Sequence, residues 1–294
     1  MPRIVNLGLV QRPCDDSVAA NRAAIAHAVG EAAEAGANLV LLPELHDGPY
    51  FCQQEDPAQF DRAEPIPGPG SEFLARLARE HRVVLVGSLF ERRAPGLYHN
   101  TAVVLDADGR LAGRYRKMHI PDDPGYYEKY YFTPGDLGFR PVDTAVGRLG
   151  VLVCWDQWFP EAARLMALAG AELLLYPTAI GWDPRDDEAE QARQLDAWIT
   201  VQRGHAVANG LPLAACNRVG FEAAPEPGPG QLFWGNSFIA GPQGEILARA
   251  GEGPEVLVTP VDLERTEAVR RVWPFLRDRR IDAYHDLTRR YIDQ

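Results

Sequence analysis

The sequence predicts an α/β fold with mixed sheets, and three patterns support this prediction. Short apolar segments, such as residues 37–44 and 171–177, are typical of strands buried on both faces. Longer segments with helical character, at residues 21–35 and 187–209, are separated from one another by strands of this kind. Residues 101–115 read as a hairpin closed by an Asp-Ala-Asp-Gly turn. This alternation indicates mixed sheets covered by helices rather than one parallel sheet.

Local signals place the remaining elements. We expect Gly36 to end the first helix, Ser71 to cap the second, and residues 241–244 to form a hairpin turn. Residues 224–230, rich in Pro and Gly, are expected to form a surface loop. Because no linker is evident, we predict a single domain over residues 1–294 with a C-terminal arm from about residue 264. Further strands are expected at 5–10, 82–90, 143–146, 149–154, 212–217, 236–240, 245–250 and 255–261, and further helices at 71–80 and 161–169.

Composition narrows the functional classes. The formal net charge of −11 argues against nucleic-acid binding, which needs a basic face, and is compatible with a cationic small substrate. The four cysteines lack CxxC spacing, which argues against a disulfide framework or a zinc site. The N-terminus lacks a signal-peptide pattern, and no apolar run reaches the roughly 18 residues of a membrane span. We therefore expect a cytoplasmic protein that binds neither nucleic acid nor membranes.

Cys154 stands where an apolar strand ends and a helix is about to begin, in the stretch LVCWDQWFPEAAR. One interpretation is a small buried core thiol, since free cysteine is among the most buried residue types. The other is a nucleophile, because a strand–turn–helix junction can expose a side chain while backbone N–H groups converge on a developing oxyanion. The residues alone leave both interpretations open.

Two charged residues stand at comparable positions. Glu44 follows the apolar run 39–42, and a carboxylate there is rarely fully buried without a partner. Lys117 leaves a predicted hairpin strand between apolar neighbours. Each residue alone is also compatible with a solvated surface position. If their strands are adjacent, however, a carboxylate, an ammonium and a thiol would form one site.

The segments LPE at Glu44, RKMH at Lys117 and CWDQWFPE at Cys154 together resemble the carbon–nitrogen hydrolase (nitrilase) superfamily. The resemblance extends over about residues 4–261 and includes the longer segments KMHIPDDPGYYEKYYFTPGD and YPTAIGWDP. It implies a four-layer α–β–β–α sandwich and a homodimer or higher homo-oligomer. It also implies that no metal or cofactor is needed.

The same resemblance implies roles for individual residues. Glu44 would be the general base, Lys117 the cation that stabilises the transition state, and Cys154 the nucleophile. Glu128 matches a second glutamate of the family that positions groups or relays protons. The backbone N–H of Trp155 would meet the oxyanion together with Lys117.

The longer segments most resemble members of the family that hydrolyse N-carbamoylputrescine to putrescine, carbon dioxide and ammonia, a step in polyamine biosynthesis from agmatine. Such a substrate ends in an ammonium, so a carboxylate and aromatic walls are expected at the far end of the pocket. The residues expected there are Asp123, Tyr130, Trp182 and Asp187, with Asp122, Asp183, Asp186 and Tyr126 as further possibilities.

Two alternatives remain at this level. The first is hydrolysis of another N-carbamoyl compound or ω-amide; carboxylate-ended substrates of that kind would call for a distal arginine. The second is a catalytically silent scaffold that binds proteins, which the intact Glu44, Lys117 and Cys154 disfavour.

Overall fold

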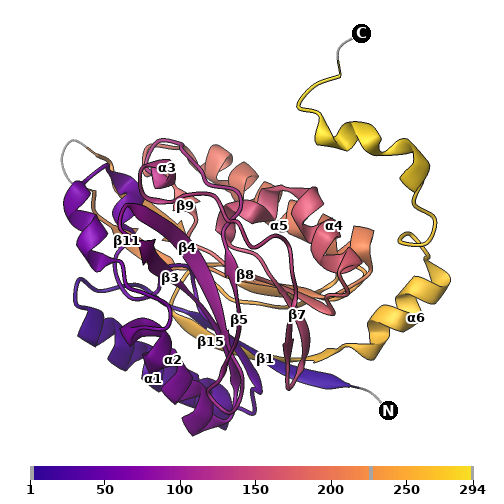
Figure 1. Cartoon of the computed structure of the whole chain (residues 1–294), viewed down its shortest axis with the longest axis horizontal. Helices are drawn as coiled ribbons and strands as arrows, with labels where there is room; N and C mark the ends of the chain where they lie inside the picture. Colours follow the sequence, from indigo (N-terminus) through magenta and orange to yellow (C-terminus); the bar gives the residue numbers. More distant parts are fainter. Residues whose placement is uncertain (1–2, 225–227, 293–294) are drawn as a thin grey trace.

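The computed structural model describes residues 3–224 and 228–292, in which two six-stranded sheets pack face to face with helices on their outer sides (Figure 1). The first sheet has the strand order β15-β1-β2-β3-β4-β5, and its strands β1, β2 and β3 are parallel while the other pairs are antiparallel. Its strands are β1 (Ile4–Gln11), β2 (Leu39–Leu41), β3 (Val84–Ala94), β4 (Leu97–Leu105), β5 (Leu111–Arg116) and β15 (Glu255–Asp262).

The second sheet repeats this mixed arrangement, with the order β14-β13-β10-β8-β7-β6 and a parallel centre formed by β7, β8 and β10. The predicted turn at residues 241–244 joins β13 and β14, and the Gly244 N–H donates to the Gly241 carbonyl. The predicted strand over 149–154 ends at Val151, before Cys154. The strands are β6 (Val142–Thr144), β7 (Gly147–Val151), β8 (Leu173–Pro177), β10 (Leu213–Cys216), β13 (Phe238–Ala240) and β14 (Ile246–Arg249).

Helices α1 and α2 cover the first sheet, and α4 and α5 cover the second, giving the expected α–β–β–α order of layers (Figure 1). The predicted N-cap of α2, Ser71, is wrong. This helix begins at Pro69 after Gly68, and Ser71 lies inside the first turn, where its hydroxyl accepts from the Gly68 N–H. The reason is that proline is favoured at the first helical position, which moves the start upstream. The bounds are α1 (Val18–Glu34), α2 (Pro69–His81), α3 (Glu128–Tyr131), α4 (Pro160–Leu168), α5 (Glu188–Asn209) and α6 (Glu264–Val272).

A third, three-stranded sheet was not predicted. It has the order β11-β12-β9, from Val219–Glu222, Gln231–Trp234 and Gly181–Trp182. Strands of two to four residues are too short to show an alternating pattern, which explains why the sequence did not reveal them. The predicted loop over 224–230 connects β11 and β12, and its residues 225–227 lie outside the described part of the chain.

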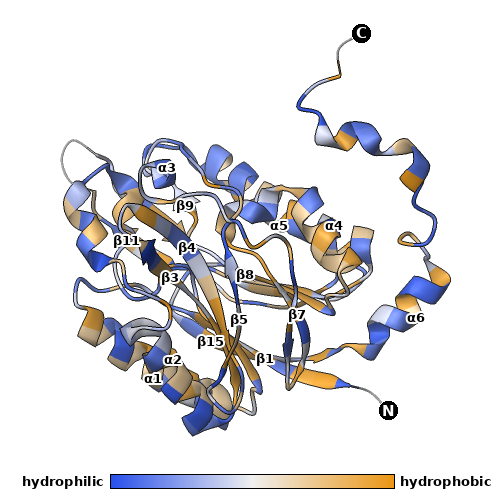
Figure 2. Cartoon of the chain, viewed as in Figure 1, coloured by the Kyte–Doolittle hydropathy of each residue, from blue (hydrophilic) through white to orange (hydrophobic). Residues whose placement is uncertain are grey.

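The main core lies between the two large sheets, where apolar strand residues from both meet (Figure 2). A second apolar cluster fills the space between the first sheet and helices α1 and α2. Both strand surfaces of the first sheet are thus buried, which accounts for the continuous apolar runs in the sequence. Loops at the ends of these strands are held between two rigid layers, a setting suited to a functional site.

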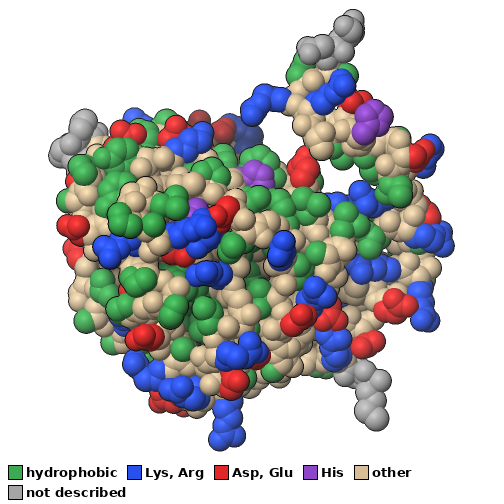
Figure 3. Space-filling model, viewed as in Figure 1, with side chains coloured by type: hydrophobic (Ala, Val, Ile, Leu, Met, Phe, Trp, Pro, Cys, Tyr) green, Lys and Arg blue, Asp and Glu red, His purple; other side chains and the backbone are tan. Residues whose placement is uncertain are grey.

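Beyond β15 the chain continues as an arm, residues 264–292, that runs away from the sandwich (Figures 1 and 3). The arm exposes several large apolar side chains, including Val272 at 70%, Ile281 at 76% and Tyr291 at 80%. On the face drawn in Figure 3, acidic and basic side chains are interspersed. Within residues 3–224 and 228–292, no helix has the length and apolar character needed to cross a membrane.

Candidate active site

Glu44, Lys117 and Cys154 meet between the two large sheets. Glu44 follows β2, Lys117 follows β5, and Cys154 follows β7 of the other sheet. All three side chains are buried, with exposed fractions of 0%, 1% and 5%. The strands β2 and β5 are not neighbours, because β3 and β4 lie between them. The contact is therefore made by the segments that follow the strands rather than by adjacent strands.

Lys117 is held by two carboxylates. Its Nζ lies 2.8 Å from Glu44 Oε1 and 2.7 Å from Glu128 Oε2. Burial by itself lowers the pKa of Lys117, but the charges of Glu128 and Glu44 outweigh burial and hold this pKa well above its usual value. The ammonium is thus a permanent cation inside a poorly hydrated site, where it can stabilise a developing negative charge.

The two carboxylate oxygens of Glu44 differ in their environment. Oε1 accepts from Lys117 and, at 2.7 Å, from the side-chain amide of Asn100 on β4. Oε2 is buried and accepts no hydrogen bond from the described residues. A buried acceptor without a partner is costly, and such an acceptor is expected at a site where a reacting group donates a hydrogen to it during the reaction. Oε2 is therefore suited to take a proton from a thiol or from water.

Glu128 begins the short helix α3 and is the second carboxylate that contacts Lys117. Tyr50 donates its phenolic hydrogen to Glu128 Oε1 at 2.6 Å, while Lys117 contacts Oε2. Burial raises the pKa of Glu128, Lys117 lowers it and Glu44 raises it again, with a resulting value of about 7. Because its charge changes near neutral pH, Glu128 can alter how Lys117 is held.

Cys154 adopts a left-handed backbone conformation with φ of 40°, which is uncommon for a residue other than glycine. It begins a single 3-10 turn that leads into α4, so the thiol stands at a sharp strand-to-helix junction. Burial and the charge of Glu44 raise the pKa of Cys154 well above its usual value, although Lys117 lowers it. The resting group is therefore a thiol, and its attack requires a base.

The turn after Cys154 is fixed by the buried carboxylate of Asp156. Its Oδ2 accepts from the Val153 N–H and the Tyr115 hydroxyl, both at 2.9 Å, and its Oδ1 accepts from the backbone N–H of His119 at 3.0 Å. These bonds tie the turn to β5 and to the segment that follows Lys117. The carboxylate thus holds the thiol and the ammonium in a constant relation to each other.

A cavity of about 420 Å³ opens onto the thiol. Its walls are aromatic, formed by Tyr126, Trp155, Trp158 and Trp234, and such a size suits a small extended molecule. Three aspartates also line it, and the described residues of the lining include no lysine or arginine. These aspartates are Asp123, Asp183 and Asp186.

The other residues expected at the far end have different surroundings. Tyr130 is 37% exposed and packs against Phe60 and Tyr131, while Trp182 packs against Trp234 and donates to the Gln191 carbonyl. Asp187 accepts from the Glu190 N–H as the N-cap of α5. None of Tyr130, Trp182 and Asp187 lines the cavity, whereas Asp123 and Trp155 do.

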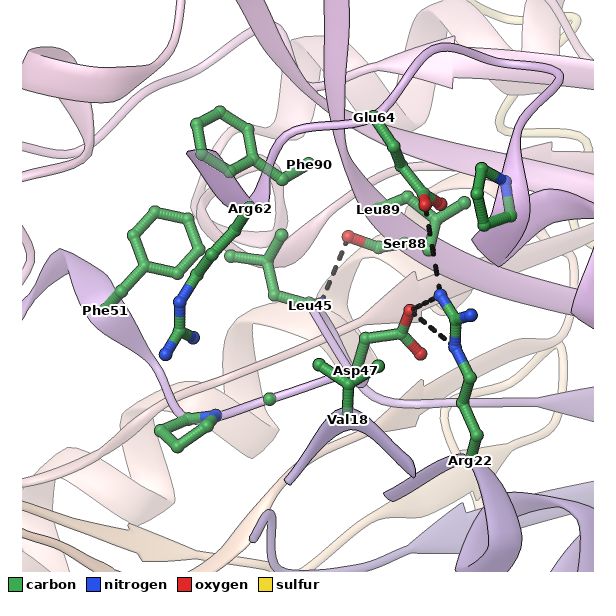
Figure 4. A pocket seen from close by; sticks show the side chains of 13 residues that line it. Val18, Arg22, Leu45, Asp47, Phe51, Arg62, Glu64, Ser88, Leu89 and Phe90 are labelled. Atoms are coloured by element: carbon green, nitrogen blue, oxygen red, sulfur yellow. Dashed lines mark hydrogen bonds and ion pairs between the residues drawn. The ribbon is translucent and has the colours of Figure 1, made fainter. Parts of the chain in front are cut away.

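A second cavity, of about 290 Å³, is lined by residues that directly follow Glu44, among them Leu45 and Asp47, and its lining does not include Cys154 (Figure 4). There Arg22 of α1 binds Asp47 Oδ2 at 2.7 Å, and the Leu45 N–H donates to the Ser88 hydroxyl. Ser88 in turn donates to Asn100, which holds Glu44. The segment 44–48 therefore carries the buried Glu44 carboxylate at its start and the ionic contact of Asp47 with Arg22 three residues later.

Residues 6–271 match the carbon–nitrogen hydrolase family. The chain belongs to the carbon–nitrogen hydrolase superfamily. It is 54% identical to a carbon–nitrogen hydrolase from Helicobacter pylori G27, whose crystal structure superposes with a TM-score of 0.96 over 98% of this chain and 100% of that one. This carbon–nitrogen hydrolase is thus an α/β protein with the two mixed sheets of the superfamily.

Two curated relatives of this carbon–nitrogen hydrolase have named activities. An N-carbamoylputrescine amidase from Solanum lycopersicum is 48% identical over 96% of this chain and 94% of its own length. A citrullinase from Francisella tularensis is 41% identical over 98% of this chain and 99% of its own. Both names describe hydrolysis of a ureido group, but the two substrates differ at the other end.

Three residues that hold the cluster were missed by the sequence analysis: Tyr50, Asn100 and Arg218. The first two contact the Glu128 and Glu44 carboxylates directly, and the third contacts the Glu44 backbone. None belongs to the segments that carried the resemblance. A buried position for Arg218 could have been inferred from its place between the apolar segments 211–216 and 219–221, but its partners could not.

Proposed function

We propose that this chain hydrolyses N-carbamoylputrescine to putrescine, carbon dioxide and ammonia. The observation that supports this most directly is the cavity at the Cys154 thiol, whose walls carry Asp123, Asp183 and Asp186 and whose described lining has no basic side chain. An ammonium at the end of an extended chain is complementary to such a wall. The 48% identity to an N-carbamoylputrescine amidase supports the same substrate.

In the proposed reaction, the sulfur of Cys154 attacks the ureido carbon while its proton passes to Glu44 Oε2. Lys117 and the Trp155 N–H stabilise the oxyanion of the tetrahedral intermediate. The intermediate collapses with loss of ammonia, which takes the proton from Glu44, and leaves an N-alkylcarbamoyl thioester on Cys154. A water molecule then gives a proton to Glu44 and attacks the thioester carbon. The thiol is restored, and the released carbamate decomposes to carbon dioxide and putrescine.

Within this mechanism Glu128 is proposed to orient Lys117, because its Oε2 holds the ammonium at 2.7 Å. The Lys117 backbone N–H donates to the Asn100 carbonyl, and Asn100 also holds Glu44. The base and the cation are thus fastened to the same residue of β4.

Citrulline hydrolysis is a second candidate, and the 41% identity to a citrullinase favours it. Citrulline carries both an ammonium and a carboxylate at the end remote from the ureido group. Its carboxylate would lie among three aspartates without a described basic partner in the cavity lining, which costs binding energy. We therefore place citrulline second.

The test is ammonia release from N-carbamoylputrescine, citrulline, N-carbamoyl-β-alanine and a short ω-amide, each at matched concentrations. The proposal expects the highest kcat/KM for N-carbamoylputrescine and no release by Cys154→Ala. Higher kcat/KM for citrulline would transfer the assignment to the second candidate. No release from any of the four would remove the enzymatic proposal and restore the scaffold alternative.

A further inference from the structure

Arg218 is the largest charged side chain in the described chain that is fully buried outside the catalytic cluster, with an exposed fraction of 0%. It directly precedes β11 of the small third sheet and lies 5.4 Å from the ring centroid of Phe233 on β12. It does not line the cavity at the thiol. The proposed mechanism gives it no role, yet burying a guanidinium is expensive unless its donors are matched.

The donors of Arg218 are directed at the backbone carbonyls of Glu44 and of residues that follow it. Its Nη2 donates to the carbonyls of Glu44 at 3.0 Å and Leu45 at 2.8 Å, and its Nη1 donates to the carbonyl of Gly48 at 2.9 Å. Leu45 has a φ of 47°, in the left-handed region, so the chain turns sharply directly after Glu44. A fixed fork of donors can hold such a turn, which a flexible ammonium cannot reproduce.

Arg218 also reaches the second catalytic carboxylate through two other residues. Its Nη1 contacts Glu222 Oε1 at 2.6 Å, and Glu222 Oε2 accepts from the Tyr50 backbone N–H at 2.6 Å. The hydroxyl of Tyr50 donates to Glu128. Since Lys117 joins Glu128 to Glu44, the contacts close into a ring that begins and ends at Arg218.

We propose that Arg218, anchored by Glu222, is a positioning residue for the reaction: it holds the turn after Glu44 and thereby sets the spacing of Glu44 and Glu128 around Lys117. The inference rests on the proposed catalytic roles of these three residues. It also assigns a task to the third sheet, since Arg218 precedes β11 and Glu222 ends it. Through these two residues the sheet braces the turn that carries the catalytic base.

The test compares Arg218→Lys with Arg22→Lys in the full-length chain. Arg22 is a matched control because it binds Asp47 in the same 44–48 segment, from the second cavity, without contacting the Glu44 or Leu45 carbonyls (Figure 4). Arg218→Lys is expected to lower kcat about 10- to 100-fold with KM within about threefold, since a small misplacement of a catalytic group has an effect of this size. Arg22→Lys should stay within about twofold of the wild type in both constants.

A second readout needs no substrate: the rate at which iodoacetamide alkylates Cys154, measured against pH. In the wild type, Glu44 assists removal of the thiol proton, so alkylation proceeds near neutral pH. In Arg218→Lys a displaced Glu44 assists less, and the rate should rise only at higher pH. A purely structural role would lower the melting temperature without moving this pH profile.

Wild-type kcat together with a wild-type alkylation profile in Arg218→Lys would overturn the proposal, as would an equal loss in Arg22→Lys. If Arg218→Lys does not fold, Glu222→Gln takes its place as the test variant. Glutamine keeps the size of glutamate but can no longer accept from both Arg218 and the Tyr50 N–H. It should show the same displaced profile, and an unchanged profile would overturn the proposal. Since alkylation is independent of substrate, failure to cleave N-carbamoylputrescine would contradict the proposed function without deciding the role of Arg218.

Discussion

Glu44 and Lys117 form a fully buried ion pair in which Nζ contacts Oε1 at 2.8 Å and leaves Oε2 without a partner in the described chain. The pair therefore separates two tasks within one carboxylate. Oε1 accepts from the Lys117 ammonium and fixes its position, whereas Oε2 can accept a proton. A substitution that changes only one of the two oxygens tests this division of tasks.

Glu44→Gln is expected to lower kcat about 10²- to 10⁴-fold, the usual contribution of a positioned general base. Glutamine can keep its oxygen at the Oε1 position, where Lys117 and Asn100 donate, while an NH₂ group replaces the acceptor at Oε2. Steady-state ammonia release measures the loss, and an unchanged melting temperature shows that the fold is intact. Activity within threefold of the wild type would mean that Glu44 is not the base.

Iodoacetamide should modify Cys154 and spare Cys52 and Cys216. Cys154 is only 5% exposed, but it lines the cavity of about 420 Å³, whereas Cys52 and Cys216 are 0% exposed. Peptide mapping by mass spectrometry identifies the site. Cys154→Ala should abolish the modification, and Cys14→Ala should leave it unchanged. Protection by a substrate would connect the modified thiol to the cavity.

Turnover should fall as pH decreases through about 7, because protonation of Glu128, whose pKa is raised to that value by burial, removes the charge that holds Lys117 on one side. Turnover falls on the acid side because only the ionised form of Glu128 holds the Lys117 ammonium in place. A kcat–pH profile measures the step. Glu128→Gln should have lower activity throughout and lack this step, whereas a step that persists in that variant belongs to another group.

The sequence was sufficient to identify the cluster because Glu44, Lys117 and Cys154 each follow a strand within a recognisable short segment. Most strands and helices were predictable from apolar runs and helical spacing, which report burial directly, whereas the four-layer order followed from the family resemblance. The supporting residues were not predictable. Arg218 and Glu44 are far apart along the chain, and only the tertiary fold brings the guanidinium to the Glu44 carbonyl.

The aspartates that line the cavity were also only partly predictable from the sequence. An acidic loop with aromatic neighbours was expected, and the cavity has both. Which aspartate faces inward depends on where α5 begins. Asp187 serves as the N-cap of that helix, and this leaves Asp183 and Asp186, one turn or less upstream, on the cavity wall.

Deletion of residues 264–294 is expected to reduce the size of the assembly. The arm presents Val272, Trp273, Ile281, Leu287 and Tyr291 to solvent, each more than half exposed, and a surface of this kind is typical of a contact with another subunit. Size-exclusion chromatography with light scattering measures the change. An assembly of unchanged size would show that the arm does not join subunits.

Asp186→Asn should raise KM for N-carbamoylputrescine about tenfold, because loss of a partly buried charge partner is worth on the order of 1.4 kcal/mol. Of the three cavity aspartates, Asp183 is already paired with Arg185, and Asp123 is exposed. Asp186 is half-buried, and its carboxylate accepts from the Gln194 amide at 2.9 Å without an ion pair to a described side chain. Its charge is thus the least compensated. Asp187→Asn is the matched control, since asparagine also caps helices and this position lies outside the cavity lining. Kinetics with a neutral ω-amide complete the comparison: Asp186→Asn should leave that reaction unchanged, and an equal rise in KM for both substrates would show that Asp186 shapes the cavity without recognising the ammonium.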